Sequence, residues 1–381
     1  MTSPAQRVDA MGPRRGSVGT VARFLLPKIG QALFVVWASY TVAFLLIHAL
    51  PGDPVLAALA VRGGDATTTD PEALAELRAR YGLDGPLWQQ YLVGFFGIFR
   101  GDLGVSIATG LPVTDTILRV AGPTAALAGF ALVVGFLIAL GFTVWAYVAR
   151  PAWVRNVIVQ IPPLGIAIPA FLTGLVLITV FSFGLGWFPA SGATGFASVV
   201  LPGITLALPT AAIFFQVFSA AVFDAGASPF VFTANAKGLS QSTVVFRHVL
   251  RNAMLPAITI IGLQVGYLAG GTAVVETVFS RDGIGRLTVD AVLARDINVL
   301  MGVVVVVASV YAVVTLVVDA LYGVIDPRTR TQVVGARPAA EAPVDGDPVA
   351  STFGGSAPVP AAFGGPAGDP ARSEDETGAR S

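Results

Sequence analysis

The chain has 381 residues, of which 54% are hydrophobic and only 12% charged, with 23 basic against 23 acidic side chains. Soluble domains carry roughly twice this share of charge, so the surplus apolar surface must face lipid. A net charge of zero gives no reason to expect nucleic acid as a partner. The absence of cysteine excludes disulfides, thiolate catalysis and cysteine–metal sites. These properties predict an all-α membrane protein.

The N-terminal segment, residues 1–28, precedes the first apolar stretch. Arg14 and Arg15 are compatible with a secretory or twin-arginine signal. However, the apolar stretch that starts at Ile29 is longer than a signal core, and Pro-Gly-Asp-Pro follows it where a cleavage site needs small residues. We therefore expect an uncleaved first helix over 29–50, with Met1 and Met11 both open as start sites.

Runs of about 20 apolar residues without charge predict six transmembrane helices. No Asp, Glu, Lys or Arg occurs between Asn156 and Phe223, a stretch too long for one crossing, so the chain must turn within 184–192. The predicted spans are 29–50, the stretch between Arg119 and Arg150, 157–181, 199–222, 254–275 and 299–325. Prolines in the second, third and fourth spans predict kinks, either for packing or around a translocation pathway.

Lysine and arginine gather in every second loop. They flank the first span at its N-terminal side, follow the second and the sixth spans, and occur in the loop 223–253. Cytoplasmic loops carry this excess, so both termini are predicted to be cytoplasmic and 51–119 an external loop. Residues 326–381 are rich in Ala, Gly, Pro, Ser and acids, which predicts a disordered cytoplasmic tail.

The loop 223–253 contains two helix signals. Ser228 followed by Pro229 predicts an N-terminus, Gly238 a left-handed C-cap, and Ser240 the cap of a second helix over 241–252. A short capped helix on the cytoplasmic face suits docking of another protein. An ordinary amphipathic linker explains the same pattern, and the physical pattern leaves both interpretations open.

The residues Thr-Ala-Asn-Ala-Lys-Gly-Leu-Ser at 233–240 and Arg-His-Val-Leu-Arg-Asn-Ala-Met-Leu-Pro at 247–256 resemble the signature loop of ABC-importer permeases. The dipeptide/oligopeptide/nickel type, and its first permease subunit, is the nearest likeness. Similar stretches occur, in the family's order, at 50–54, 81–91, 100–106, 276–287 and 326–328.

The resemblance implies a type I ABC-importer permease fold, with a five-helix core over 120–325, in the bacterial cytoplasmic membrane. It also implies a second homologous permease, ATP-binding cassette ATPase subunits and an extracytoplasmic solute-binding protein as partners. The residues that match the coupling positions of the family are Ala234, Ala236, Lys237, Gly238, Arg247 and Arg251. Family members usually carry arginines near Gln216, Ser219, Phe232 and Asn235, so this loop is less basic than the family pattern.

Polar and ionisable groups are rare within the predicted spans. Those that either line a pathway or join helices through hydrogen bonds are Gln160, Thr173, Thr205, Gln264 and Tyr267. Glu276 and Asp319 lie near span ends, where a functional role competes with snorkelling or capping. The scattered acids of the loop 51–119 fit recognition of a binding protein better than a metal site.

Two other functional classes fit this sequence less well. An ion-coupled secondary transporter needs buried ionisable groups near the membrane midplane, and the second to fourth spans have none. A membrane enzyme needs convergent acid, histidine or serine groups, and the chain has only two histidines. No Walker A pattern occurs, so we expect no enzyme activity and no bound cofactor, with ATP hydrolysed by a partner subunit. Peptides are the expected solutes; nickel or another non-peptide solute is the alternative.

Overall fold

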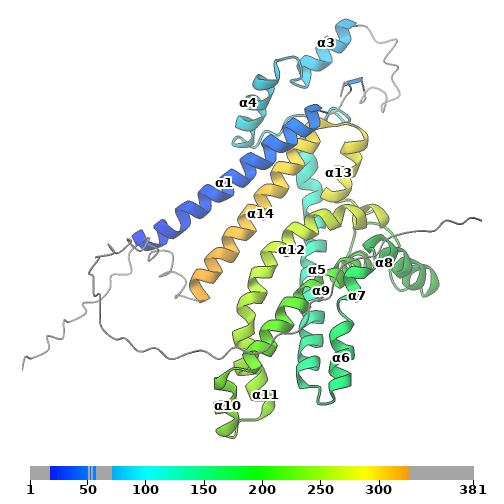
Figure 1. The fold of residues 1–381 in the computed structure, drawn as a ribbon. Helices are drawn as coiled ribbons and strands as arrows, with labels where there is room; N and C mark the ends of the chain where they lie inside the picture. The colour runs from blue at the N-terminus through cyan, green and yellow to red at the C-terminus, as the bar shows by residue number, and fades with distance from the viewer. Residues whose placement is uncertain (1–17, 50–51, 53–54, 57–70, 326–381) are drawn as a thin grey trace, which may run out of the picture. The chain divides into compact units, whose positions relative to one another are not determined.

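The computed structural model describes residues 18–49, 52, 55–56 and 71–325 (Figure 1). These residues are helical apart from turns and one isolated bridge between Val105 and Pro112. The predicted disordered tail, residues 326–381, lies outside the described residues, as do residues 1–17. The helices are α1 Val18–Ala49, α3 Pro71–Arg80, α4 Leu87–Ile98, α5 Val113–Val148, α6 Ala152–Gln160, α7 Leu164–Ala167, α8 Ala170–Leu177, α9 Ala197–Gly226, α10 Pro229–Ala236, α11 Gln241–Thr243, α12 Leu250–Val278, α13 Ile284–Leu293 and α14 Ile297–Ile325.

Five of these helices, α1, α5, α9, α12 and α14, are long and apolar enough to cross a membrane. A bent pair, in which α6 and α7 meet α8 and its π-helical extension Ile178–Gly184 at 97°, is long and apolar enough to count as a sixth span. This confirms the expected all-α architecture of about six spans. The kink predicted from the prolines of the third span, 157–181, is present, and the bend extends over residues 152–184.

The break in the third span has a cause in the sequence. Pro162, Pro163 and Pro169 each lack the N–H that continues a helix, and the ring of Pro169 disfavours helical backbone at Ile168. Ile168 is accordingly extended, with φ −93° and ψ 123°. The prolines predicted a kink, but the size of the bend depends on how the two halves pack against α9.

Helix α9 is the central helix of the bundle. Most of its residues are buried, and it packs against α5, α7, α8 and α12. Close approach relies on small residues: a Cβ at Gly203 would collide with the ring of Phe130, and one at Gly135 of α5 would lie 2.8 Å from Thr210 Cγ2. The core therefore forms where α5 and α9 pack closely together.

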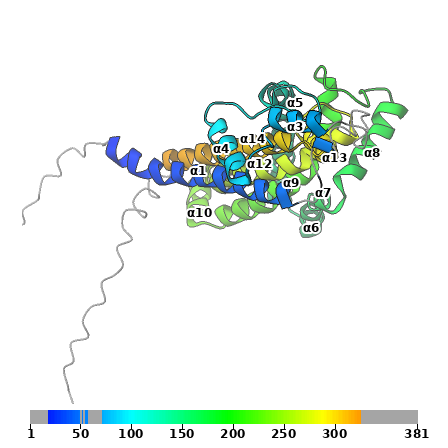
Figure 2. The same cartoon turned by 90° about the horizontal axis from the view of Figure 1, so that it is seen from above.

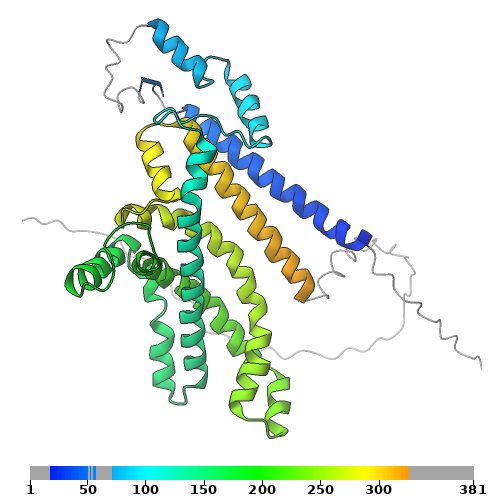
Figure 3. The ribbon, with the colours of Figure 1, turned by 180° about the vertical axis from the view of Figure 1, so that it is seen from behind.

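Helices α1 and α14 run side by side and form a second layer (Figures 2 and 3). Lys28 Nζ of α1 lies 2.8 Å from Asp319 Oδ2 of α14, and both side chains are only partly exposed. Asp319 is thus one half of an ion pair between two spans. This ion pair explains why a charged residue, Asp319, is tolerated within the predicted last span.

Candidate functional site

The loop predicted to face the cytoplasm folds into a compact knob, residues 228–249, made of α10, α11 and a π-helical turn Val244–Val249. The knob lies at the end of the bundle opposite α3, α4 and α13 (Figure 1). Gly238, with φ +77°, ends α10 as predicted, and its N–H donates to the Asn235 carbonyl at 2.9 Å. Ser240 Oγ accepts the Thr243 N–H at 3.3 Å, which confirms the second cap.

Helix α10 begins at Pro229 with Ser228 as its N-cap, as predicted, although the Ser228 hydroxyl donates to the Asp224 carbonyl at 3.2 Å and accepts no N–H of α10. The predicted end of the second helix is wrong. The second helix does not end at Asn252, because the π-helical turn continues without a break into α12. Pro256 lies inside α12, where it removes one hydrogen bond, to the Asn252 carbonyl, without interrupting the helix.

The knob is anchored by an apolar cluster at the ends of α9 and α12. Val231 and Ala234 of α10 pack with Phe218 and Val222 of α9 and with Val249. Ala234 is only 7% exposed. Of the six predicted coupling residues, Ala234 therefore belongs to the anchoring core and offers no surface to a partner.

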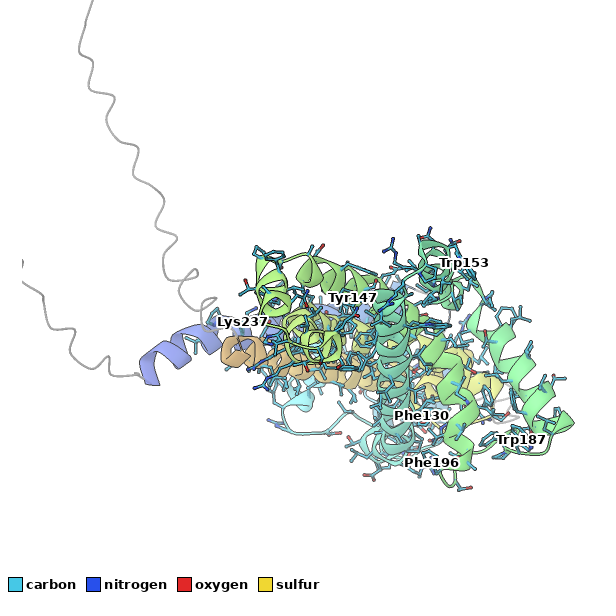
Figure 4. The ribbon with its side chains drawn as sticks, turned by 90° about the horizontal axis from the view of Figure 1, so that it is seen from below. Phe130, Tyr147, Trp153, Trp187, Phe196 and Lys237 are labelled. Atoms are coloured by element: carbon cyan, nitrogen blue, oxygen red, sulfur yellow. The ribbon has the colours of Figure 1, made fainter. Side chains whose placement is uncertain are left out.

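The other five predicted coupling residues are all exposed: Ala236, Lys237, Gly238, Arg247 and Arg251. Lys237 lies on the knob in the view from below (Figure 4). Apolar groups stand beside these residues, since Phe232 is 78% exposed and Phe246 is also exposed. No acidic residue occurs between Asp224 and Glu276 in the sequence. The exposed surface of the knob therefore carries apolar, neutral polar and positively charged side chains and no acidic one.

The structure does not bring the five predicted pathway residues together. Thr205 is fully buried and donates to the Leu201 carbonyl at 2.9 Å, while the buried Gln264 donates to the Thr210 carbonyl of α9 at 3.1 Å. Gln160 and Tyr267 are exposed on α6 and α12, and Thr173 of α8 is partly buried. None of the five lines the apolar cavity of about 710 Å³ between α1, α5, α12 and α14.

A buried polar cluster lies at the opposite end of the bundle, where α12 is followed by α13. The two oxygens of Glu276, a fully buried residue, accept the Thr124 hydroxyl at 2.6 Å and the Arg286 N–H at 3.1 Å. Arg281, 1% exposed, donates to the Ser198 carbonyl and hydroxyl at 3.2 Å. Burial lowers the pKa of the Arg281 guanidinium, and the nearby Glu276 carboxylate acts in the opposite direction.

At Glu276 the sequence is compatible with snorkelling or capping as readily as with function, and no sequence pattern singles out Arg281. The cluster joins α5, α9, α12 and α13, and a Cβ at Gly283 would collide with the Glu276 carboxyl group. The sequence does contain a signal for this cluster. Glu276 and Arg281 have opposite charges and are five residues apart, and Gly283 and Gly285 follow them in the stretch 276–287 that resembles the permease family.

Comparison with known proteins matches residues 131–331 to the family model described as "Binding-protein-dependent transport system inner membrane component". Residues 21–128 match the N-terminal model of the same kind of component. The chain is 38% identical over 287 residues to glutathione transport system permease proteins of Escherichia coli and Shigella flexneri, covering 75% of this chain and 92% of each relative. A solved inward-facing structure of the MetNI methionine ABC transporter aligns with a TM-score of 0.48 and 17% identity, covering 55% of this chain and 95% of that one.

Proposed function

This chain belongs to the family of binding-protein-dependent transport system inner membrane components, and on that premise we propose that its knob docks onto a separate ATP-binding cassette ATPase. Membership makes the chain a multi-pass permease subunit of an ATP-driven importer in the inner membrane. It also disfavours the alternative of an ion-coupled secondary transporter. The ATPase-docking surface and the solute are our proposals.

The observation that carries the docking proposal is the exposed face of the knob. Ala236 and Gly238 have small side chains or none, and, its two chain neighbours aside, no atom of the described residues lies within 4 Å of a Cβ built on Gly238. Another protein can thus approach the backbone closely at this point. Lys237, Arg247 and Arg251 would attract acidic groups of the ATPase, and Phe232 supplies apolar contact area.

The anchoring of the knob supports a mechanical role. Val231 and Val249 connect it to the ends of α9 and α12 through buried contacts, so a displacement of the knob would move both helices. ATP would be hydrolysed by the partner, and this chain would bind no cofactor. We propose that a second homologous permease and an extracytoplasmic solute-binding protein complete the importer.

For the solute we propose small peptides or peptide-derived compounds. The curated relatives that share 38% identity over three quarters of this chain are named as glutathione permeases. Uptake of labelled di- and tripeptides, glutathione and nickel by a deletion strain with and without the gene tests this. Import of peptides or glutathione supports the proposal, whereas import of nickel alone would contradict the solute and leave the permease assignment intact.

Docking is tested by ATPase activity and co-purification of the complete importer. Ala236→Glu places a charge on the exposed face of α10 without backbone strain, and Gly238→Glu does so at the close-approach point. Both are expected to reduce ATPase co-purification and to abolish transport while membrane insertion persists. Gly238→Asn should retain coupling because asparagine tolerates left-handed backbone.

The matched control is Ala152→Glu, an exposed alanine in the first turn of α6 on the same side of the bundle. It adds the same charge outside the knob and should leave transport unchanged. Wild-type uptake by both knob glutamate variants would refute docking at this surface.

A further inference from the structure

Helix α4, Leu87–Ile98, contains no charged residue and lies in the region that the sequence predicts to be an external aqueous loop. One of its faces packs against α1 and α14. Tyr91, Phe95 and Ile98 join a cluster built around Tyr40, Phe44, Met301 and Val305. Gly94 allows this approach, since a Cβ there would collide with the Tyr40 hydroxyl.

Hydrogen bonds fix the position of α4 on α1. The Tyr40 hydroxyl donates to the Tyr91 carbonyl at 3.1 Å, and Thr41 Oγ1 lies 2.8 Å from the Tyr91 hydroxyl. The Tyr40 and Phe95 rings lie 5.7 Å apart. The middle of α4 is therefore held at the level of Tyr40 and Thr41.

That level is inside the outer half of the membrane. Tyr40 lies nine residues before the end of α1 at Ala49, at most about 14 Å along the axis at ~1.5 Å per residue. Met301 and Val305, in the same cluster, lie within the first three turns of α14, whose apolar span starts at Ile297. Two spans independently place α4 within reach of the outer leaflet, which is about 15 Å thick in hydrocarbon.

The face of α4 next to this cluster is an apolar stripe, and its Phe96 and Phe99 rings lie 5.7 and 5.5 Å from the ring of Phe95. Trp88, Leu92 and Phe96 follow one another at helical spacing, Phe99 continues the row, and their side chains are 41–69% exposed. On a third side Gln89 and Gln90, with the exposed Val93 between them, line a cavity of about 340 Å³ together with Asp84 and Asn298. Such a division into apolar and polar sides is typical of helices that lie in a membrane interface.

The residues at the two ends of the stripe fit the same placement. Trp88 is the residue type enriched at membrane interfaces, and Arg100, which follows Phe99, has a long side chain that reaches headgroups from an apolar position. Val42, Leu45 and Leu46 of the outer half of α1 are also exposed and apolar. A lipid-facing surface thus already exists on the helix against which α4 packs.

We infer that α4 is an interfacial helix whose stripe of Trp88, Leu92, Phe96 and Phe99 binds acyl chains of the outer leaflet. Residues 87–99 then form a membrane anchor for the external region and are not part of an aqueous loop. A binding protein that approaches this side would meet α3 and the turns around α4, since the stripe itself is covered by lipid.

Spin-label accessibility tests the inference in the complete importer, reconstituted in phosphatidylethanolamine/phosphatidylglycerol vesicles. This chain has no cysteine of its own, so each single variant introduces one labelling site in this subunit, and any cysteines of the partner subunits are replaced first. Leu92→Cys and Phe96→Cys carry the label on the stripe. Leu46→Cys on α1 is the lipid-facing control, and Glu76→Cys on the exposed side of α3 is the aqueous control.

Labels on the stripe are expected to be as accessible to oxygen as the lipid-facing label at Leu46→Cys. Their accessibility to the water-soluble nickel chelate is expected to be far below that of the label at Glu76→Cys. Nickel-chelate accessibility equal to that of Glu76→Cys would overturn the inference in favour of an aqueous docking face. Low accessibility to both reagents would overturn it in favour of cover by another protein subunit. Variants that retain uptake are the ones compared, so misfolding does not enter the result.

Discussion

The guanidinium of Arg281 donates to the Ser198 carbonyl at 3.2 Å, and Pro202 of α9 leaves that carbonyl free to accept. A proline has no N–H, so the carbonyl four residues before it loses its helical partner. In lipid such a carbonyl needs another donor. A residue from the loop after α12 thus completes the hydrogen bonding of α9, 83 positions earlier in the chain.

Replacing Arg281 by methionine should strongly destabilise the outer end of the bundle. It leaves the Ser198 carbonyl and the Glu276 carboxylate without their cationic neighbour, and breaking a buried charge arrangement costs about 3 kcal/mol or more. The apparent melting temperature of the detergent-solubilised importer measures the effect. Arg286→Met is the control, because its ion pairs with Asp282 and Asp290, at 3.8 Å, are partly exposed and are worth ~1 kcal/mol at most. Equal melting temperatures for the two variants would contradict the role of Arg281.

Asp296→Ala should release the external loop around Ser106. The buried Asp296 carboxylate accepts the Ser106 hydroxyl at 2.6 Å and the Ala108 N–H at 3.0 Å, and it also accepts the Val299 N–H at 3.2 Å at the start of α14. The substitution removes the cap of α14 and leaves the donors of Ser106 and Ala108 unpaired. We expect it to lower the free energy of unfolding by about 2 kcal/mol.

Limited proteolysis of right-side-out vesicles reports the loosening as faster cleavage within 101–112. The control is Asp290→Ala, which removes an exposed carboxylate of α13. We expect the protease to cleave this variant at the wild-type rate. The assignment fails if cleavage of the Asp296 variant is not accelerated.

The ion pair between Lys28 and Asp319 should show coupling in a double-mutant cycle. Each single change to leucine leaves one charge on a partly buried helix surface, whereas the double change removes both. Because the two side chains are about one-third exposed, we expect a coupling free energy of only ~1 kcal/mol. Melting temperatures of the four proteins give the value, and strictly additive effects would show that the pair does not join α1 to α14.

Gly165→Ala should destabilise the packing of the bent span on α9. A Cβ at this position would lie 2.5 Å from the Leu208 carbonyl oxygen and 3.4 Å from the Pro209 nitrogen, both of which are backbone atoms. Overpacking of this kind costs about 1–3 kcal/mol.

Gly141→Ala is the control within a helix, because in the described part of the chain no atom beyond its own helix backbone lies within 4 Å of a Cβ at this position. It is expected to be neutral or to stabilise by up to about 1 kcal/mol through helix propensity. The two variants differ only in their neighbours, so a melting temperature of Gly165→Ala at or above that of Gly141→Ala would show that this contact is not close.

The knob shows how far local reasoning extends. Gly238 and Ser240 act as the caps that the sequence indicated, since a cap depends on a few neighbouring residues. Ser228 differs because its hydroxyl has a competing acceptor in the last turn of α9, the Asp224 carbonyl. Ala234 matches the family's coupling pattern but packs against α9, and a pattern of small residues does not tell which face is covered.

Polar residues within the spans were harder to interpret. The sequence leaves open whether Gln264 and Thr205 line a pathway or join helices through hydrogen bonds. In the structure Gln264 joins α12 to α9, whereas Thr205 donates to a carbonyl of its own helix. Glu276 has its hydroxyl partner, Thr124, 152 positions away. No local pattern contains that pairing, because it exists only when α5, α12 and α13 have assembled.

The amino-acid sequence by itself determined that the chain crosses a membrane about six times, which end of the bundle carries the basic loops, and where α10 ends. Each of these depends on composition, charge or backbone preference within a short stretch. The tertiary structure decided the 97° bend of the third span, the buried contacts of Ala234, the partners of Glu276 and Arg281, and the two faces of α4. These depend on which distant helices come into contact, and that follows from packing over the whole bundle.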